Sequence, residues 1–377
     1  MVENLEGVKY ETGTYNYDLY RFNQSADLEW ENYHSNDTPQ NPFMLENGKG
    51  YLYASKADRT LTFSTPFNTD NTKTVDLEYD ADAEFAGWNL VGNPFPVQAW
   101  ANKSYYTMNS EGTGLVANEV ASSTPIPPLT GVMMQTTSTT GENVTFSTTE
   151  PTQQSANNGS LQIALQQAVE PVETPLTKVG PSTSSGTLTL DNAIVSFNEG
   201  TQLGKYYFGR QNANINLPQG GEEYAIAFSD GHGEMPLNFK ATKDGEYTLS
   251  VAPDGGEMEY LHLIDNLTGA NVDLTATPQY TFTAKTTDYA SRFRLVFSIC
   301  EDANGDNAPF AYVSNGEIIL TTNVNGNATL QIVDVTGRVI VQGDAINRVS
   351  TSGMTSGIYV LRLINGDDVR TQKIVIP

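Results

Sequence analysis

The chain is built from short runs of Tyr, Thr, Val, Ile and Phe that are separated by Gly, Asn, Asp and Pro. This composition and spacing favour short strands joined by turns. The clearest predicted strands are GYLYAS (50–55), TLTFS (60–64), YTLSVA (247–252), YTFTA (280–284), FRLVFSI (293–299) and IYVLRLI (358–364). We therefore expect an all-β protein of tandem β-sandwich domains, immunoglobulin-like or jelly-roll-like in arrangement. One run, SLQIALQQAV (160–169), is the one plausible short helix, and it could equally be a strand followed by a loop.

Turn residues mark several predicted hairpins. The segments that begin at Gly50 and Gly131 each hold two strand-like runs around a polar turn, which predicts two similar hairpins facing one core. Thr-Gly stands at the reversal between two β runs in both 263–274 and 332–341. Glycine supplies the positive φ that such tight turns need. The pair at 365–366, Asn-Gly, is a strong signal for a further tight hairpin.

Polar stretches divide the chain into three predicted modules. The first boundary is TTEPTQQSANNGS (148–160) and the second is EDANGDNAP (301–309), while VEPVETPLTKVGPSTSSG (169–186) is interpreted as a long loop inside the middle module. The predicted modules are a β-rich domain, residues 1–155, a β-sandwich, residues 156–303, and a small C-terminal domain, residues 304–377.

Charge supports the second boundary. The chain has 20 basic and 44 acidic residues, for a formal net charge of −24, yet residues 308–377 carry five of each. The whole acidic excess therefore lies upstream of the C-terminal module. So negative a surface repels phosphate backbones and anionic lipid headgroups, which argues against nucleic acids and membrane surfaces as partners.

The N-terminal and apolar segments bear on export. No run of about 18 or more apolar residues occurs, so no membrane-spanning helix is expected. Residues 1–20 lack the basic start and apolar stretch of a signal peptide, so an exported protein would need a signal upstream of Met1. The single cysteine, Cys300, rules out an internal disulfide or a multi-cysteine zinc site and is interpreted as a buried structural thiol.

Three segments near the C-terminus carry a family resemblance. SNGEIILTTN (314–323), LQIVDVTGRVIVQG (330–343) and GMTSGIYVLRLINGDDVRTQKIVIP (353–377) resemble, in order and spacing, the type A C-terminal sorting domain of cargo proteins of the type IX secretion system. The positions that carry the sorting signal by this resemblance are Gly316, Gly337, Gly357, Tyr359 and Lys373.

The resemblance implies a fold, two partners and a location. The fold would be a seven-stranded immunoglobulin-like sandwich, recognised by an outer-membrane translocon. A surface sortase-type peptidase would cut within 302–309 and join the cargo to an anionic lipopolysaccharide at the cell surface. Upstream, GWNLVGNPFP (87–96), with weaker segments as far as 300, resembles a recurring region of large surface and secreted proteins of the same bacteria. No activity is implied by that second resemblance.

Catalytic chemistry is hard to assemble from this sequence. The three histidines, His34, His232 and His262, form no H-E-x-x-H motif, and no G-x-S-x-G elbow or phosphate-binding loop occurs. Cys300 lacks a protease signature. His232, in the Gly-rich segment SDGHGEM, is the histidine with a candidate role in ligand binding, while His262 is interpreted as a packed or rim residue of a strand.

A few segments bear on metal and sugar binding. DANGDN (302–307) imitates the start of a calcium loop, but Val313 stands where that loop family needs an acidic residue, so no metal or cofactor is expected. DADAE (80–84) has the same weakness. Trp30, Trp100 and the tyrosine-rich runs could form an aromatic sugar-binding platform, whereas Trp88 lies inside 87–96 and is expected in the core. The tyrosines concerned are Tyr10, Tyr15, Tyr17, Tyr20, Tyr105 and Tyr106.

These observations favour a non-enzymatic surface or secreted protein that serves in adhesion or interaction, with a glycan or a host or surface protein as its ligand. The alternatives are the accessory region of a secreted protease or glycosidase whose catalytic domain lies upstream or within residues 1–155, or a carbohydrate-binding module.

Overall fold

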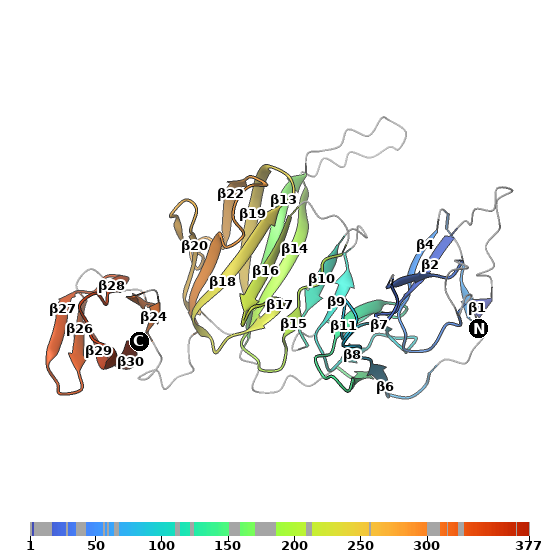
Figure 1. The fold of residues 1–377 in the computed structure, drawn as a ribbon, viewed down its shortest axis with the longest axis horizontal. Coiled ribbons are helices and arrows are strands. Elements are labelled where there is room, and N and C mark those ends of the chain that lie inside the picture. Colours follow the sequence, from blue (N-terminus) through green and yellow to red (C-terminus); the bar gives the residue numbers. More distant parts are fainter. Residues whose placement is uncertain are drawn as a thin grey trace. The chain divides into compact units, whose positions relative to one another are not determined.

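The computed structural model shows an all-β chain (Figure 1). It describes residues 2–3, 17–27, 29–34, 43–55, 57–58, 60–63, 68–109, 114–120, 124–150, 159–169, 186–208, 213–255, 258–299, 310–314, 316–322, 328–366 and 368–376. Every regular element among these residues is a strand, which confirms the expected fold class. The described part of the chain accordingly contains no helix with the length and apolar character needed to cross a membrane.

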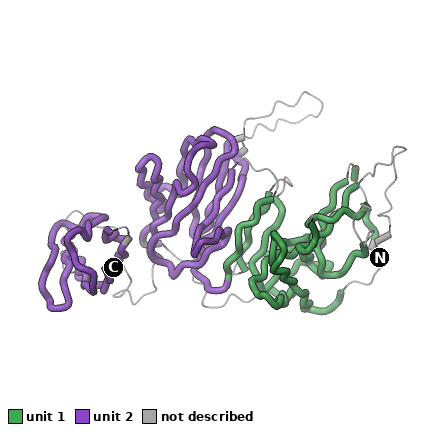
Figure 2. The backbone as a smooth tube through the Cα atoms, viewed as in Figure 1, with its two compact units in different colours: residues 1–157, 201–210 green, residues 158–200, 211–377 purple. Residues whose placement is uncertain are grey.

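The chain forms two compact units (Figure 2). Unit 1 comprises residues 1–157 and 201–210, and unit 2 comprises residues 158–200 and 211–377. The short excursion 201–210 lies within the segment expected to be a β-sandwich of its own, yet it is part of unit 1. Residues 151–158 and 301–309, on which the predicted module boundaries fall, lie outside the described residues.

Unit 1 contains four small sheets. Their hydrogen-bonded orders are β10-β9-β11-β7, β6-β12-β8, β3-β2-β4 and β1-β5. The strands of these sheets are β1 (Val2–Glu3), β2 (Tyr17–Phe22), β3 (Trp30–Asn32), β4 (Leu52–Ser55), β5 (Thr62–Phe63), β6 (Thr72–Leu77), β7 (Trp88–Gly92), β8 (Trp100–Ala101), β9 (Tyr105–Met108), β10 (Leu115–Asn118), β11 (Gly131–Gln135) and β12 (Glu142–Ser147). A further strand of unit 1, β15 (Leu203–Gly204), belongs to none of these four sheets. One core cluster joins the sheet β10-β9-β11-β7 to the sheet β6-β12-β8. Val91 and Met134 of the first and Val144 and Phe146 of the second are all fully buried in it.

The two predicted hairpins of unit 1 do not form. From Gly50 onward, β4 pairs with β2, whereas β5 pairs with β1. From Gly131 onward, β11 pairs with β7 and β9, whereas β12 pairs with β6 and β8. In each segment the polar turn thus leads the chain from one sheet into another. Both strands can bury an apolar face in this way without pairing with each other. The repeated sequence pattern is therefore the same for this arrangement as for a hairpin.

The segment 87–96 is built around close backbone approaches. Gly87 has φ +76°, and a Cβ there would lie 2.0 Å from the carbonyl oxygen of Thr136. Asn89 is buried, accepts a hydrogen bond from the Glu78 amide at 2.9 Å and donates to two backbone carbonyls. Asn93 donates to the carbonyl of Ile126 at 2.9 Å. Trp88 is buried, as expected. This recognisable sequence therefore encodes packing and backbone hydrogen bonds, because buried polar groups require partners.

The excursion 201–210 completes the core of unit 1. Tyr206 is buried, and its ring lies 5.0 Å from that of Trp88 and 5.4 Å from that of Phe85, centroid to centroid. The hydroxyl of Tyr106 donates to the carbonyl of Gly204 at 3.1 Å. A fragment that stops near residue 155 therefore lacks side chains that its own core requires.

The larger part of unit 2 is one long sheet folded upon itself. Its hydrogen-bonded order is β21-β20-β23-β18-β16-β17-β14-β13-β19-β22. The strands are β13 (Ser160–Val169), β14 (Gly186–Ser196), β16 (Ala213–Gln219), β17 (Glu222–Phe228), β18 (His232–Ala241), β19 (Gly245–Asp254), β20 (Met258–Asp265), β21 (Asn271–Asp273), β22 (Gln279–Ala284) and β23 (Phe293–Ile299). Phe239 of β18 and Phe282 of β22 stack edge to face at 5.1 Å although five strands separate them in the order. The sheet therefore encloses one sandwich core.

The ambiguous segment 160–169 is a strand, β13, and not a helix. Leu161, Ile163 and Leu165 are fully buried at alternate positions, with the half-buried Gln162 and Ala164 between them. This period of two belongs to a strand with one buried face. Residues 170–185, most of the predicted long loop, lie outside the described residues.

A buried ion pair stands at one corner of this sandwich. Arg292 and Asp265 are each 1% exposed, and the guanidinium donates to both carboxylate oxygens, at 3.2 and 2.9 Å. Tyr280 also donates to Asp265, at 3.0 Å, and Arg292 lies over the ring of Phe282. Buried charges are tolerated only when paired and hydrogen-bonded, and here both partners are.

The C-terminal part of unit 2 is a seven-stranded sandwich of two sheets, β24-β25-β28 and β27-β26-β29-β30. The strands are β24 (Ala311–Ser314), β25 (Glu317–Leu320), β26 (Thr329–Asp334), β27 (Val339–Asp344), β28 (Arg348–Ser350), β29 (Gly357–Asn365) and β30 (Asp368–Ile376). Its strands pair only with one another, and its core cluster includes Phe310, Leu320, Ile332 and Leu361. We call residues 310–376 the C-terminal sandwich. Its strand count and immunoglobulin-like form agree with the expectation.

The predicted turns of unit 2 are confirmed with one shift. Gly269 at φ +77° and Gly337 at φ +85° lie in the reversals β20–β21 and β26–β27. Gly366 at φ +64° lies between β29 and β30, but Asn365 still pairs with Asp368. Asn365 is therefore the last residue of the strand and not the first central residue of the turn.

Candidate functional site

The five positions expected to carry a sorting signal play different parts in the C-terminal sandwich. Gly316 at φ +76° lies between β24 and β25 and directly precedes β25, and Gly337 lies in the turn after β26. Gly357 opens β29, opposite Ile376. Tyr359 is buried, and its hydroxyl donates to the carbonyl of Thr355 at 2.8 Å. These four residues therefore shape or fill the fold, and we place any direct contact with a partner elsewhere.

Lys373 is the one of the five that presents a charged side chain to solvent. It is exposed and lies opposite Val360 in the β29–β30 register. The neighbours on either side of it, Gln372 and Ile374, point to the other face of the strand, because successive residues of a strand alternate.

Strand β30 is an edge strand, paired along one side with β29. Ile374 and Ile376 are buried in the core. The Gln372 side chain accepts hydrogen bonds from the amides of Phe310 and Ala311 at 2.7 and 2.8 Å and donates to the Ala311 carbonyl. This side chain thus ties the edge strand to the start of the opposite sheet.

A carboxylate organises the turn that carries the V-T-G-R sequence. Asp334 accepts hydrogen bonds from the Thr336 hydroxyl at 2.6 Å and from the Arg338 amide at 3.0 Å, and it pairs with the Arg338 side chain at 3.1 Å. The Thr336 hydrogen bond is the main cause that lowers the pKa of Asp334 to about 2. Asp265 caps the related turn after β20 by accepting from the Leu267 amide. Sequence reasoning found the Thr-Gly pairs but missed these aspartates.

The histidines are engaged in packing or in side-chain hydrogen bonds. The Gly-rich segment around His232 is not a loop at that residue, because His232 is the first residue of β18. Its Nδ1 lies 2.9 Å from the hydroxyl of Ser298 on β23. His262 stacks on Tyr260 at 4.1 Å and bonds Asn271 through Nδ1. His34 lies edge-on to Tyr17.

The aromatic platform is not assembled from the residues proposed for it. Trp30 of β3 is half-buried and contacts Phe22 at 5.3 Å, while Trp100 lies in β8, in a different sheet. Tyr17, Tyr105 and Tyr106 are buried in the unit 1 cores. Their rings are therefore not available to stack on a sugar. Tyr10 and Tyr15 lie outside the described residues, as do Cys300 and 302–307.

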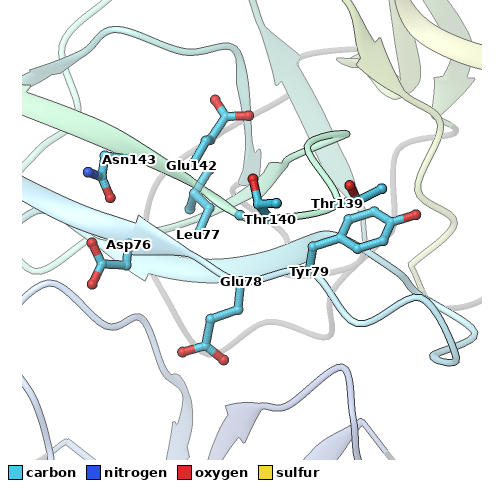
Figure 3. A pocket seen from close by; sticks show the side chains of 9 residues that line it. Asp76, Leu77, Glu78, Tyr79, Thr139, Thr140, Glu142 and Asn143 are labelled. Atoms are coloured by element: carbon cyan, nitrogen blue, oxygen red, sulfur yellow. The ribbon is translucent and has the colours of Figure 1, made fainter.

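A first hollow, of about 640 Å³, lies beside β6 and β12 in unit 1 (Figure 3). Three carboxylates line it, those of Asp76, Glu78 and Glu142, and in Figure 3 they point in three different directions. Glu142 is held by Lys103 at 2.8 Å and by the Thr136 hydroxyl at 2.6 Å. Burial alone would raise the pKa of Glu142, but these two contacts outweigh it and the pKa falls below its ordinary value. A set of carboxylates that point away from one another does not resemble the facing acid–base pair of a glycosidase.

A second hollow, of about 300 Å³, lies between β2, β4 and β7 of unit 1. It mixes charged, amide, aromatic and aliphatic side chains. Its lining residues are Arg21, Phe22, Asn23, Gln24, Met44, Glu46, Lys49, Gly50, Tyr51, Glu78, Trp88, Asn89 and Leu90. Lys49 pairs with Glu78 at its rim, at 3.4 Å. These residues come from three separate stretches of sequence, so no local motif could have revealed them.

Metal binding finds no support among the described residues, where no group of three or more His, Cys, Asp or Glu side chains gathers. DADAE (80–84) forms a turn in which Asp80 accepts from the Asp82 amide at 3.1 Å. A hydrogen bond from Ser25 is the main cause that lowers the pKa of Asp80.

Comparison with known proteins assigns the C-terminal sandwich. Residues 314–377 match the family described as secretion system C-terminal sorting domain. No curated protein matches the chain. The match begins within β24 and covers all six strands that follow, so sequence family and folded module coincide. The chain is therefore a cargo protein of the type IX secretion system, and its C-terminal sorting domain directs export across the outer membrane to the cell surface or the extracellular space.

Proposed function

We propose that the region upstream of the sorting domain is a non-enzymatic interaction module, presented at the cell surface or released, that binds a glycan or a protein of another surface. The observation that carries the proposal is the use made of the reactive and aromatic side chains. His232 and His262 are held in side-chain hydrogen bonds between neighbouring strands, and Trp88 is buried. Side chains that pack in the core or bond neighbouring strands stabilise a scaffold, which is what an interaction module requires.

The second hollow is the place in unit 1 where we propose that a ligand binds. The hollow is lined by the guanidinium of Arg21 and the amide of Asn23, which both also donate to Glu31, and by the Glu46 carboxylate and the Tyr51 ring. Sugars are bound by this combination, because a ring covers their C–H face while polar groups reach their hydroxyls. The same observation favours the carbohydrate-binding module as the second candidate function.

A binding experiment on the exported chain tests this proposal. The full chain is assayed against a glycan array and a panel of extracellular proteins, together with the variants Glu46→Ala and Lys49→Ala. Both side chains line the hollow, and Glu46 is exposed, so the fold should survive. Glu84→Ala, also exposed but outside the hollow, is the matched control. We expect a ligand whose binding weakens at least about tenfold in the hollow variants only. Absence of any bound glycan or protein would refute an interaction role.

The remaining alternative is that the region accompanies a secreted protease or glycosidase. Incubating the full chain with protein and polysaccharide substrates distinguishes the two. Hydrolysis that survives purification would favour the enzyme. A catalytic domain encoded upstream of Met1 would make the region an accessory to it.

We further propose that a sortase-type peptidase removes the sorting domain after export, by cleavage within 302–309, and joins the cargo to an anionic lipopolysaccharide. These residues lie between the last strand of the middle sandwich, β23, and the first of the sorting domain, β24. Mass spectrometry of the surface form gives its C-terminal residue. A mature form that still contains Ile376 would refute the cleavage.

A further inference from the structure

The outer face of the four-stranded sheet in the sorting domain has apolar rows at one end, followed by a polar row across its middle. Strand alternation fixes which side chains point outward, because Tyr359, Leu361 and Leu363 of β29 are buried in the core. The outward positions then pair across the strands in rows. One row is Ile358 opposite Val375, and the next is Val339, Val333, Val360 and Lys373. We call the five apolar side chains of these rows the apolar end.

The apolar end is exposed to an unusual degree for its residue types. Ile358 is 43%, Val375 61% and Val339 45% exposed. Val335, in the turn at the same end of the sheet, is 73% exposed. Isolated apolar residues on a surface are normal, but neighbours in register mark interaction surfaces.

The next row along the sheet bounds the apolar end with polar side chains. Gln342, Gln331, Arg362 and Thr371 follow one another across the strands. Gln331 donates to Gln342 at 3.2 Å and accepts from Arg362 at 3.3 Å. The polar side chains satisfy one another here, so the boundary of the apolar end is built into the sheet.

The opposite sheet of the sorting domain is already covered within unit 2. Ile319 of β25 is buried against Tyr260, Ile264 and Val296 of the middle sandwich. The Tyr312 hydroxyl donates to Glu234 at 3.0 Å. The outer face of the four-stranded sheet is therefore the large sheet face left for a partner.

Charge indicates the chemistry of that partner. The outward positions of the apolar end carry one charge, the ammonium of Lys373, and no carboxylate, in a chain with an excess of 24 acidic charges. The nearby carboxylate of Asp334 is paired with Arg338. An apolar surface that carries an acidic group opposite Lys373 would be complementary, and it would reject the acidic surfaces of the rest of the chain.

We propose that the apolar end, together with Lys373, is the surface by which the outer-membrane secretion machinery binds this sorting domain. The occupant is a protein surface of that machinery, apolar at its centre and acidic where it meets Lys373. The proposal rests on the family match and on the sheet geometry, and it is independent of what the upstream region binds.

Removal of the last residues cannot test this surface, because Ile374 and Ile376 belong to the core and their loss would unfold the domain. The test instead uses the full chain in a host with this secretion route, with Ile358→Ser/Val375→Ser as the apolar-end variant. Ile364→Ser/Val369→Ser is the matched control: the same strands, the same register relation and the same face, but the other end. Surface display is measured by protease accessibility on whole cells, and folding by thermal unfolding of the purified chains.

We expect the apolar-end variant to lose display at least about tenfold while the control keeps it. Lys373→Glu should lose display by a similar factor and Lys373→Arg should retain it, and both change only an exposed side chain. If the apolar-end variant fails to fold, the Lys373 pair decides the matter. Display of folded variants at the wild-type level, or equal loss in the control, would overturn the proposal. So would a wild-type dimer that the apolar-end substitutions dissociate, because a second copy would then be the occupant.

Discussion

At the scale of single residues, polar side chains in buried places do most to specify this fold. Asn89 and Gln24 satisfy backbone groups beside 87–96, and Asp265 and Arg292 satisfy each other. The place of Trp88 in the recognisable segment 87–96 predicted that it is buried. The sequence could not predict these polar partners, because each joins residues far apart in sequence, 27 positions in the case of Asp265 and Arg292.

Substitution of Asp265 by Asn should destabilise the middle sandwich by about 3 kcal/mol, because Arg292 keeps its buried charge and loses its counter-ion. Urea unfolding of the full chain measures the loss. Glu246→Gln, an exposed change on β19, should leave the transition in place. An unchanged midpoint in the Asp265 variant would show that the ion pair does not hold this corner together.

The same carboxylate predicts a dependence on pH. Burial alone would raise the pKa of Asp265, but hydrogen bonds from Arg292 and from the Leu267 amide outweigh it, so its pKa in the folded protein lies below the ordinary 3.8. A lowered pKa contributes stability that is complete above the unfolded value and is lost as the pH falls through the folded value. Unfolding midpoints should therefore drop below pH 3.8 more steeply in the wild type than in Asp265→Asn. Parallel curves would contradict this.

At the scale of elements, strand existence is predictable from the sequence and strand partnership is not. The runs at 247–252, 280–284 and 293–299 are strands as expected. The segment 160–169 shows how a pattern can mislead, because its glutamines favour a helix while its buried positions alternate. The predicted hairpins after Gly50 and Gly131 failed since turn residues do not reveal whether the chain returns to the same sheet.

Substitution of Tyr206 by Ala should destabilise unit 1 by about 3 kcal/mol, although Tyr206 lies beyond two strands of unit 2 in sequence. The cause is the loss of a buried ring packed on Trp88 and Phe85. The neighbouring Tyr207, which is 47% exposed, provides the control Tyr207→Ala. Hydrogen exchange in β7 and β9 reports on unit 1. Equal hydrogen exchange in both variants would mean that residues 201–210 contact unit 1 without stabilising it.

Substitution of Gln372 by Ala should destabilise the sorting domain by about 2 kcal/mol, because the amides of Phe310 and Ala311 and the carbonyl of Ala311 lose their partner. Thr371→Ala, the exposed neighbour, should have little effect. Thermal unfolding of the two variants provides the comparison. Equal unfolding midpoints would show that water replaces the hydrogen bonds of the Gln372 side chain without loss of stability.

At the scale of the whole molecule, the sorting domain is a folded signal joined to an acidic cargo. Its family could be inferred from three segments near the C-terminus, because turn glycines and the G-x-Y strand lie at fixed spacings. The surface that a partner reads could not be inferred, since four of the five recognisable positions form turns, open a strand or fill the core. Lys373 alone offers an exposed charge, and the valines and isoleucine beside it are ordinary strand residues until the register places them together.

The most direct measurement compares the location of two chains in a host with this secretion route. One is the full chain and the other ends at residue 300, and both carry the same leader for export to the periplasm. We expect protease on whole cells to reach the full chain, or the medium to contain it, while the shortened chain stays protected in the periplasm. Equal exposure of the two chains would contradict the claim that residues 314–377 direct export.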